Sequence, residues 1–368
     1  MDFDGFLQVK LDERKNKDLY RSLVSYEDQV DFSSNDYLGL ARSGVLNLPA
    51  YPGLSSGATG SRLVSGNSIE AVQAEAAVAH FHGTEAALIF NCGYMANMGL
   101  FSSIAGRGDT LVADAHIHAS IIDGLQLSHA SKLKFKHNDI DSLGQKLKRA
   151  KGNKFVAVES VYSMGGDEAP LEPIADLCLQ HKAFLIVDEA HATGVWGENG
   201  QGLVGKYKLG NQIAASIHTF GKALGLHGAA VTCSSALKNY LVNFARPFIY
   251  STALPPHTYL QIQHAYKLLP TVDRQPLKEL IAYFRNSAKA LNHLQFIDSK
   301  SQIQGIVIGD SVKAKALSQH LLTKGILAKA ILSPTVPAGT ERIRICLHAF
   351  NKVNQVDLLL SEINSFLT

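Results

Sequence analysis

The segment Phe184–His191 reads FLIVDEAH, an apolar run that ends in two acids and is followed closely by a histidine. A short apolar run of this kind fits a strand that is buried on both faces, as in a parallel sheet covered by helices. In open α/β sheets, ligands gather at the carboxyl ends of the strands. We therefore expect Asp188 and His191 to lie at a ligand site on that edge of a sheet.

Similar apolar runs recur along the chain and alternate with segments of helical length, which predicts a mostly parallel α/β sheet with helices on both faces. The runs are Ala86–Phe90, Thr110–Ala113, Leu133–Phe135, Phe155–Glu159, Phe184–Val187, Ala214–Ile217 and Ala229–Thr232. After Pro255 and Pro256, one long helical segment over about His257–Leu294, followed by two further strands and two helices, predicts a smaller α+β domain. We predict an N-terminal arm over 1–44, a large α/β domain over 45–260 and a small C-terminal domain over 261–368.

The composition narrows the classes of protein. The 368 residues are 46% hydrophobic and 18% charged, enough for a large core. No apolar run approaches the ~20 residues of a membrane span, and the acidic N-terminus lacks a signal-peptide pattern. The net charge of +3 without a basic tract gives no reason to expect nucleic acid. Four scattered cysteines without a CxxC pair fit reduced thiols in a cytoplasmic protein.

A second segment, Ile217–Gly225 (IHTFGKALG), places Lys222 between two glycines directly after an apolar run. An amine held in a dry pocket loses its proton and becomes a nucleophile. We hypothesise that Lys222 forms a Schiff base with pyridoxal phosphate, although an ordinary loop lysine would share this local sequence. A nucleotide P-loop is excluded, because Ser216 and Ala223 stand where that motif requires Gly and Ser or Thr.

Asp188 has three chemical readings: a metal ligand, a Walker-B acid or the partner of a pyridinium nitrogen. The Walker-B role lacks its P-loop. A metal role lacks co-ligands, since nothing completes the ligand-like pairs His116 with His118 and His80 with His82, and we expect no metal. The pyridinium role suits the lysine, because a carboxylate keeps the cofactor ring protonated and able to accept electrons.

A phosphate site is predicted in Asn91–Asn97 (NCGYMAN), which follows the run Ala86–Phe90 and opens a helical pattern. The N–H groups and the dipole of a helix start favour an anion there. Gly200–Gly205 (GQGLVG) matches the dinucleotide fingerprint by letter, but it follows the loop-like Gly194–Asn199 instead of a strand. We interpret it as a chance match.

Several short segments, in this order, form a family pattern that runs nearly from end to end. They are Phe32–Leu40, Thr59–Gly66, His118–Ser120, Asp188–Gly194, Thr219–Lys222, Tyr250–Thr252 and Pro334–Pro337. With them the chain resembles the α-oxoamine synthase family of pyridoxal-phosphate enzymes. The resemblance implies the aspartate-aminotransferase-type fold (fold type I), a homodimer with shared active sites, and acyltransferase activity.

The resemblance implies four catalytic residues: Lys222, His118, Asp188 and His191. Lys222 would bind the cofactor covalently and later transfer protons. Asp188 would pair with the pyridine nitrogen, and His191 would hydrogen-bond the phenolic oxygen. Ser163 would lie close to that oxygen. His118 would stack on the ring, whereas we interpret His116 as structural.

The same resemblance assigns the phosphate to Gly93, Tyr94 and Thr219. Thr252 would reach the phosphate of the neighbouring subunit, which is why a homodimer is expected.

Substrate contacts are also implied. Arg344 would bind the carboxylate of the amino acid with Asn35 beside it, and Thr335 would contact the substrate. His118 would hydrogen-bond the acyl intermediate. Arg21, within a polar helix that we expect over residues 5–25, would hold the far carboxylate of a dicarboxylic acyl chain.

Within the family, the strongest resemblance implies decarboxylative condensation of L-alanine with a pimeloyl thioester, on CoA or a carrier protein, to 8-amino-7-oxononanoate in biotin synthesis. The alternative is a glycine-using member, such as glycine C-acetyltransferase (2-amino-3-ketobutyrate CoA ligase) or 5-aminolevulinate synthase. Two departures from the pattern stand out: a shorter segment between Arg21 and Asp31, and Ala71 and Ala74 in place of a histidine and a leucine.

Overall fold

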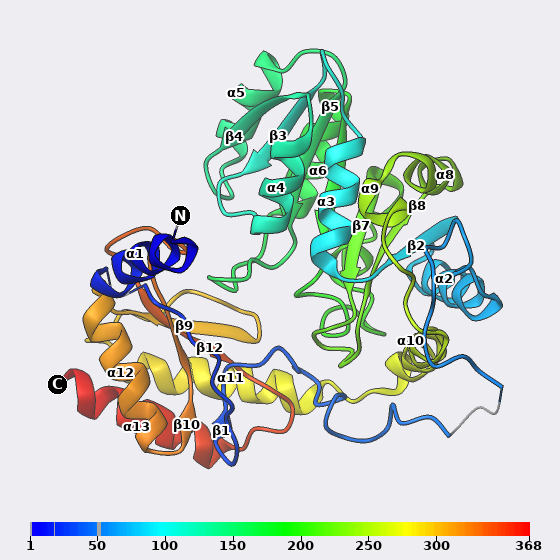
Figure 1. The fold of residues 1–368 in the computed structure, drawn as a ribbon. Coiled ribbons are helices and arrows are strands. Elements are labelled where there is room, and N and C mark those ends of the chain that lie inside the picture. Colours follow the sequence, from blue (N-terminus) through cyan, green and yellow to red (C-terminus); the bar gives the residue numbers. More distant parts are fainter. Residues whose placement is uncertain (1, 18, 50–52) are drawn as a thin grey trace.

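The computed structural model describes residues 2–17, 19–49 and 53–368 and contains a seven-stranded central sheet with the order β2-β8-β7-β6-β5-β3-β4 (Figure 1). Its strands are β2 (Ala86–Phe90), β3 (Thr110–Asp114), β4 (Ser131–Phe135), β5 (Lys154–Glu159), β6 (Ala183–Asp188), β7 (Ile213–Thr219) and β8 (Ala229–Cys233). Only β8 runs antiparallel to its neighbours in this sheet. All seven predicted strands are therefore confirmed, as is the mostly parallel sheet.

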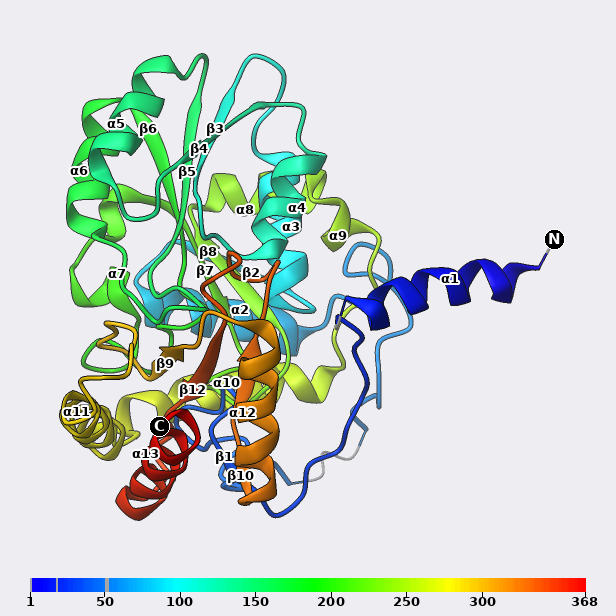
Figure 2. The same cartoon turned by 90° about the vertical axis from the view of Figure 1, so that its left-hand side faces the viewer.

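Helices cover both faces of this sheet, as Figure 2 shows. Those of the large sheet are α2 (Ile69–His82), α3 (Gly93–Ser103), α4 (Ala119–Leu127), α5 (Ile140–Arg149), α6 (Leu171–Gln180), α7 (Leu203–Lys206), α8 (Ser235–Phe244) and α9 (Arg246–Ile249). Successive residues of a strand point to opposite faces of the sheet and pack in two separate cores. Leu185 and Val187 pack in the core with α2, α5 and α6, while Ile186 packs in the core with α3, α4 and α8. Each such fully buried aliphatic side chain contributes roughly 1.5–3 kcal/mol.

The C-terminal region forms a second, antiparallel sheet of three strands with the order β11-β12-β9. Its elements are α10 (Pro256–Leu268), α11 (Gln275–Lys289), β9 (Ile303–Val307), α12 (Ser311–Thr323), β10 (Ile326–Leu327), β11 (Lys329–Ile331), β12 (Arg342–Cys346) and α13 (Val353–Leu367). The single long helix expected after Pro256 is divided by the 3-10 turn Leu269–Thr271, since Pro270 lacks an N–H for the helical ladder. The predicted boundaries at residues 45 and 260 stay predictions.

The N-terminal region departs most from expectation. Helix α1 (Phe3–Asn16) has no buried residue and projects from the body (Figure 2). The helix expected over 5–25 thus ends at Asn16, and Arg21 lies in the extended segment that follows, because a polar helix without packing gains little beyond its capped turns. Strand β1 (Val30–Asp31) then pairs with β10 and ties this segment to the C-terminal region. In the described part of the chain, no helix is long and apolar enough to cross a membrane.

Candidate active site at the carboxyl edge of the sheet

Lys222 lies in the turn that follows β7, at the edge where the parallel strands end. The turn is closed by Gly225 N donating to Lys222 O at 2.9 Å and Leu226 N donating to Phe220 O at 2.8 Å. Gly225 has φ +66°, and a Cβ there would lie 2.4 Å from the backbone nitrogen of Ala41, so only glycine fits. Gly225, three residues after this lysine, therefore shapes the turn that presents it.

The amine of Lys222 points at His191, with Nζ 2.8 Å from Nε2. Burial lowers the pKa of Lys222 to about 8, although the nearby carboxylates of Asp188 and Glu159 oppose the change. Burial, together with the charges of Lys222 and Arg344, holds the pKa of His191 well below its usual range. A neutral imidazole thus faces an amine whose proton is easily lost near neutral pH.

Asp188 ends β6 and is almost fully buried. Asn97 Nδ2 donates to its Oδ2 at 2.7 Å, and Ala190 N donates to its Oδ1 at 2.9 Å. The same Asn97 nitrogen reaches Ser120 Oγ at 3.0 Å, which in turn lies 2.7 Å from His118 Nδ1. The predicted ring partner and the predicted stacking histidine therefore belong to one hydrogen-bond network.

His118 is the N-cap of α4, where its Nδ1 accepts from Ser120 N at 3.2 Å. This bond occupies one ring nitrogen and orients the ring at the edge of the sheet. Burial and the charge of Lys222 lower the pKa of His118, and Asp188 partly offsets them. A neutral ring next to Asp188 and Lys222 suits the predicted stacking role.

Asn35 and Arg344 are joined to His191 through Tyr37. Arg344 Nη2 donates to Asn35 Oδ1 at 3.1 Å, and the Tyr37 hydroxyl donates to the same oxygen at 2.9 Å. The hydroxyl oxygen lies 2.7 Å from His191 Nδ1. Arg344 Nε also donates to Ser163 O at 2.8 Å, which brings Ser163 to the same site. These bonds connect the predicted substrate residues to the predicted cofactor residues.

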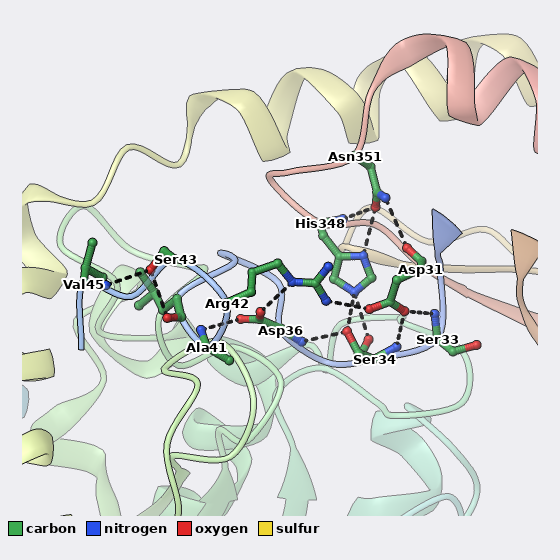
Figure 3. A network of polar contacts seen from close by, with 11 residues as sticks. Asp31, Ser33, Ser34, Asp36, Ala41, Arg42, Ser43, Val45, His348 and Asn351 are labelled. Carbon is green, nitrogen blue, oxygen red and sulfur yellow. Dashed lines mark hydrogen bonds and ion pairs between the residues drawn. The ribbon is translucent and has the colours of Figure 1, made fainter. Parts of the chain in front are cut away.

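The segment with Asn35 and Tyr37 is fixed by a polar network shown in Figure 3. Asp31 Oδ1 accepts from the backbone of Ser33 and Ser34, each at 2.9 Å, and Arg42 binds Asp31 Oδ2 at 2.8 Å. His348, which follows β12, contacts Ser34 Oγ at 3.2 Å. Hydrogen bonds from Ser34 offset the burial of Asp31 and lower its pKa to about 2. The N-terminal segment is thus tied to the strand that carries Arg344.

The predicted phosphate site lies at the start of α3. Gly93 is the first helical residue, and Cys92 before it makes no side-chain cap. A Cβ on Gly93 would come within 3.3 Å of Thr219 Oγ1, so the hydroxyl of Thr219 faces the helix start. Tyr94 lies edge-on to His118 with ring centroids 6.5 Å apart. Helix N–H groups with a neighbouring hydroxyl form an anion site.

Three predicted residues stay outside this network. Arg21 and Thr335 are exposed, and in the described part of the chain no hydrogen bond or ion pair joins their side chains to the site. Thr252 is exposed as well, but its carbonyl accepts from Asn91 Nδ2 at 2.8 Å, next to the phosphate site.

Sequence reasoning missed several residues. Tyr37 and Asn97 lie within quoted segments but had no assigned role, because only the folded contacts reveal one. Glu159 ends β5 opposite Asp188 and is 2% exposed. Burial and the charge of Asp188 raise its pKa to about 8. Its position as an acid at the end of an apolar run was the signal in the sequence that could have identified Glu159.

The departures Ala71 and Ala74 are fully buried core residues of α2.

The site fits pyridoxal phosphate. It offers an amine of lowered pKa on Lys222, a fixed carboxylate on Asp188 for a ring nitrogen, and a helix start with Thr219 for a phosphate. It also offers Arg344 for a carboxylate, since guanidinium binds carboxylates with paired donors. These are the groups that such an enzyme requires at one place.

Comparison with known proteins agrees with this geometry. Residues 27–363 match the family model "Aminotransferase class I and II". Three relatives are named 8-amino-7-oxononanoate synthase. The one from Lysinibacillus sphaericus is 40% identical over 90% of this chain and 87% of its own length. The one from Pseudomonas putida F1 is 41% identical over 98% and 96%. The one from Emericella nidulans is 39% identical over 98% and 95%.

Solved structures share the fold. A serine palmitoyltransferase with a PLP internal aldimine superposes with a TM-score of 0.88 at 28% identity, covering 99% of this chain and 97% of that one. An 8-amino-7-oxononanoate synthase from Francisella tularensis gives a TM-score of 0.76 at 29% identity, covering 92% and 98%. The predicted fold type I is confirmed. The chain belongs to the class I and II aminotransferase family.

Proposed function

We propose that this chain condenses L-alanine with a pimeloyl thioester, with loss of carbon dioxide, to give 8-amino-7-oxononanoate in biotin synthesis. One observation carries the proposal: the Lys222 amine lies 2.8 Å from His191 Nε2 at the same strand edge as Asp188. Curated relatives with that activity in their names, about 40% identical over nearly the whole chain, support the choice of reaction.

The cofactor, when bound, supplies an electron sink for the carbanion that forms when the amino acid loses its α-proton. Lys222 holds it and moves that proton at Nζ, for which a pKa of about 8 is well suited. Asp188 binds the ring nitrogen as a carboxylate whose two oxygens are oriented by Asn97 and Ala190. His191 binds the phenolic oxygen, and Ser163 lies beside it. His118 stacks on the ring.

Substrate binding is proposed for Arg344, whose guanidinium has five N–H donors and keeps some of them after contacting Ser163 and Asn35. The remaining donors bind the alanine carboxylate. Thr335 contacts the substrate, and Arg21 holds the far carboxylate of the pimeloyl chain. Both are exposed, so we place the acyl chain toward the outer side of the site.

We propose a homodimer in which Thr252 reaches the partner's phosphate site. Two observations support it: Thr252 is exposed beside Asn91, and α1 exposes apolar side chains, including Phe3 and Phe6. Sedimentation equilibrium tests it, and a monomeric holoenzyme would contradict it. The proposed location is the cytoplasm, which fits four cysteines that are all free thiols.

Product identification tests the reaction. Purified protein with pyridoxal phosphate is incubated with L-alanine or glycine and with pimeloyl-CoA, acetyl-CoA or succinyl-CoA, and the products are identified by mass spectrometry. We expect 8-amino-7-oxononanoate from L-alanine and pimeloyl-CoA. Lys222→Ala should remove turnover and the borohydride-trapped pyridoxyl adduct, whereas Lys134→Ala, an exposed lysine of β4, should keep both. A product from glycine and acetyl-CoA alone would replace this proposal with glycine C-acetyltransferase.

A further inference from the structure

Beside the Lys222 network, the carboxyl edge holds a second charged cluster with no assigned role. His137, just after β4, lies between Asp114 at the end of β3 and Asp167 in the loop after β5. His137 Nδ1 is 2.8 Å from Asp114 Oδ1, and Nε2 is 2.6 Å from Asp167 Oδ2. We call these three side chains the His137 clamp.

The geometry determines the charge of the clamp. Carboxylate oxygens only accept hydrogen bonds, and both nitrogens of an imidazole donate only when the ring is protonated. Burial by itself would lower the pKa of His137, but the two carboxylates outweigh it and raise the pKa to about 9. Asp114 is fully buried, so its charge depends on this partner. The clamp is therefore an imidazolium between two carboxylates at neutral pH.

The clamp fastens the loop that leads to His118. Asp114 Oδ1 also accepts from His116 N at 2.7 Å, and the ring of His116 stacks on His137 with centroids 4.1 Å apart. His116 is two residues before His118. The structural role expected for His116 is thus a contact with the clamp, and the direction of the loop into the site depends on it.

The clamp fastens the loop of Ser163 in the same way. Tyr162 packs edge-on against His137 at 4.4 Å, and Tyr162 N donates to Asp167 O at 2.9 Å. Asn138 links the two acids, since its N donates to Asp114 Oδ2 and its Nδ2 to Asp167 Oδ2, both at 2.9 Å. Tyr162 directly precedes Ser163.

We propose that His137, clamped as an imidazolium between Asp114 and Asp167, is a positioning residue that sets His118 and Ser163 against the cofactor. Without it, two carboxylates would face each other across the joint between the loops, and like charges repel. The inference rests on the proposed function in that both residues are taken to contact pyridoxal phosphate.

Other titratable groups face the clamp from neighbouring elements. They are His116 and Tyr162 in the adjoining loops, Glu159 at the end of β5, which influences Tyr162, and Arg342 of β12, whose charge acts on His116 and Asp167. Burial and the charge of His137 lower the pKa of His116, which moves its titration away from the range in which His137 loses its proton. Lys222 and Glu159, with pKa values of about 8, titrate in the same range as His137. The contribution of His137 is therefore taken as the difference between the wild type and His137→Gln.

The test compares His137→Gln with His320→Gln. His320 is a matched control, because its Nε2 also lies 2.8 Å from a carboxylate, Glu362, but on α12 and α13. Without cofactor, unfolding midpoints are measured from pH 6 to 10. Since the folded pKa lies above the unfolded one, the stability that His137 adds is present below pH 6.5 and is lost as pH rises through 9. The difference in unfolding midpoint between the wild type and His137→Gln should therefore shrink as the pH rises over this range.

With pyridoxal phosphate, His137→Gln should bind the cofactor at least about tenfold more weakly and shift its visible absorbance maximum, while His320→Gln changes its affinity less than about twofold. Asp167→Asn keeps the buried acid Asp114, so its cofactor affinity should lie between those of His137→Gln and His320→Gln. It replaces His137→Gln in the test if that variant does not fold. Unchanged affinity and spectrum in both clamp variants, or a stability deficit independent of pH, would overturn the proposal. These readouts need no turnover. A chain that binds the cofactor but makes no 8-amino-7-oxononanoate would therefore contradict the proposed function and leave the inference about the His137 clamp standing.

Discussion

Tyr37→Phe tests the hydrogen-bond chain that joins Arg344 to Lys222. The Tyr37 hydroxyl has one hydrogen, and it is donated to Asn35 Oδ1, which also accepts from Arg344. His191 Nδ1 must then donate to the hydroxyl oxygen, which leaves Nε2 as the acceptor that faces Lys222. The substitution removes one buried oxygen and keeps the ring, so it perturbs the chain without opening a large cavity.

The expected magnitude follows from the burial of Tyr37, which is 0% exposed. Loss of the hydroxyl leaves the Nδ1 proton of His191 buried without a partner, which costs about 1–3 kcal/mol in the free energy of unfolding. The bond that fixes the ring is itself worth about 0.5–1.5 kcal/mol, so the affinity for pyridoxal phosphate should fall by up to about tenfold.

Chemical denaturation of the cofactor-free protein measures the first quantity, and equilibrium titration with pyridoxal phosphate measures the second. Tyr266→Phe is the matched control, because this buried hydroxyl lies 3.2 Å from His82 Nε2 and outside the site network. It should lose similar stability and keep its cofactor affinity. Equal losses of affinity in both variants, or no loss of stability in Tyr37→Phe, would refute the reasoning.

Three further outcomes are expected. Gly93→Ala puts a Cβ 3.3 Å from Thr219 Oγ1 and should weaken pyridoxal phosphate binding about tenfold in titration. Gly144→Ala, whose Cβ would lie 3.7 Å from its nearest neighbour, should not weaken it. Equal affinities of the two variants would contradict the assigned phosphate site. Burial raises the pKa of Glu159 to about 8, so wild-type stability should fall more steeply between pH 4.5 and 8 than that of Glu159→Gln. The variant should be about 3 kcal/mol more stable at pH 7 by denaturation. The same pH dependence of stability in the wild type and in Glu159→Gln would contradict the raised pKa of Glu159. Because Lys222 reacts as the neutral amine, the rate of cofactor attachment in stopped-flow absorbance should rise with pH and level off above about 8; a rate independent of pH would contradict it.

Sequence pattern predicted the sheet because its strands are short apolar runs, a signal that is local. It predicted Asp188 and Lys222 because each follows such a run at the ligand-binding edge. It could not assign Tyr37 or Asn97, since their partners His191 and Asp188 lie 154 and 91 residues away in the chain. Bonds over such separations leave no periodic trace in the sequence.

Errors in the helices have local causes. The segment expected as one helix after Pro256 is divided by the missing N–H of Pro270 and by the start of α11 at Gln275. Helix α1 has no buried residue, so no tertiary contacts extend the helix expected over 5–25 beyond Asn16.

The order of strands explains why both clusters occupy one edge. Along β7-β6-β5-β3-β4, the strand ends present Thr219, Asp188, Glu159 and Asp114, and His137 follows β4. Three buried acids on consecutive strands require compensation, because isolated buried carboxylates are costly. Asp188 and Glu159 act on Lys222, whereas Asp114 contacts His137. A substitution of either cation should therefore change the pKa of the acids next to it and not of the others. Lys222 variants should alter the titration of Glu159 and leave the His137 clamp intact.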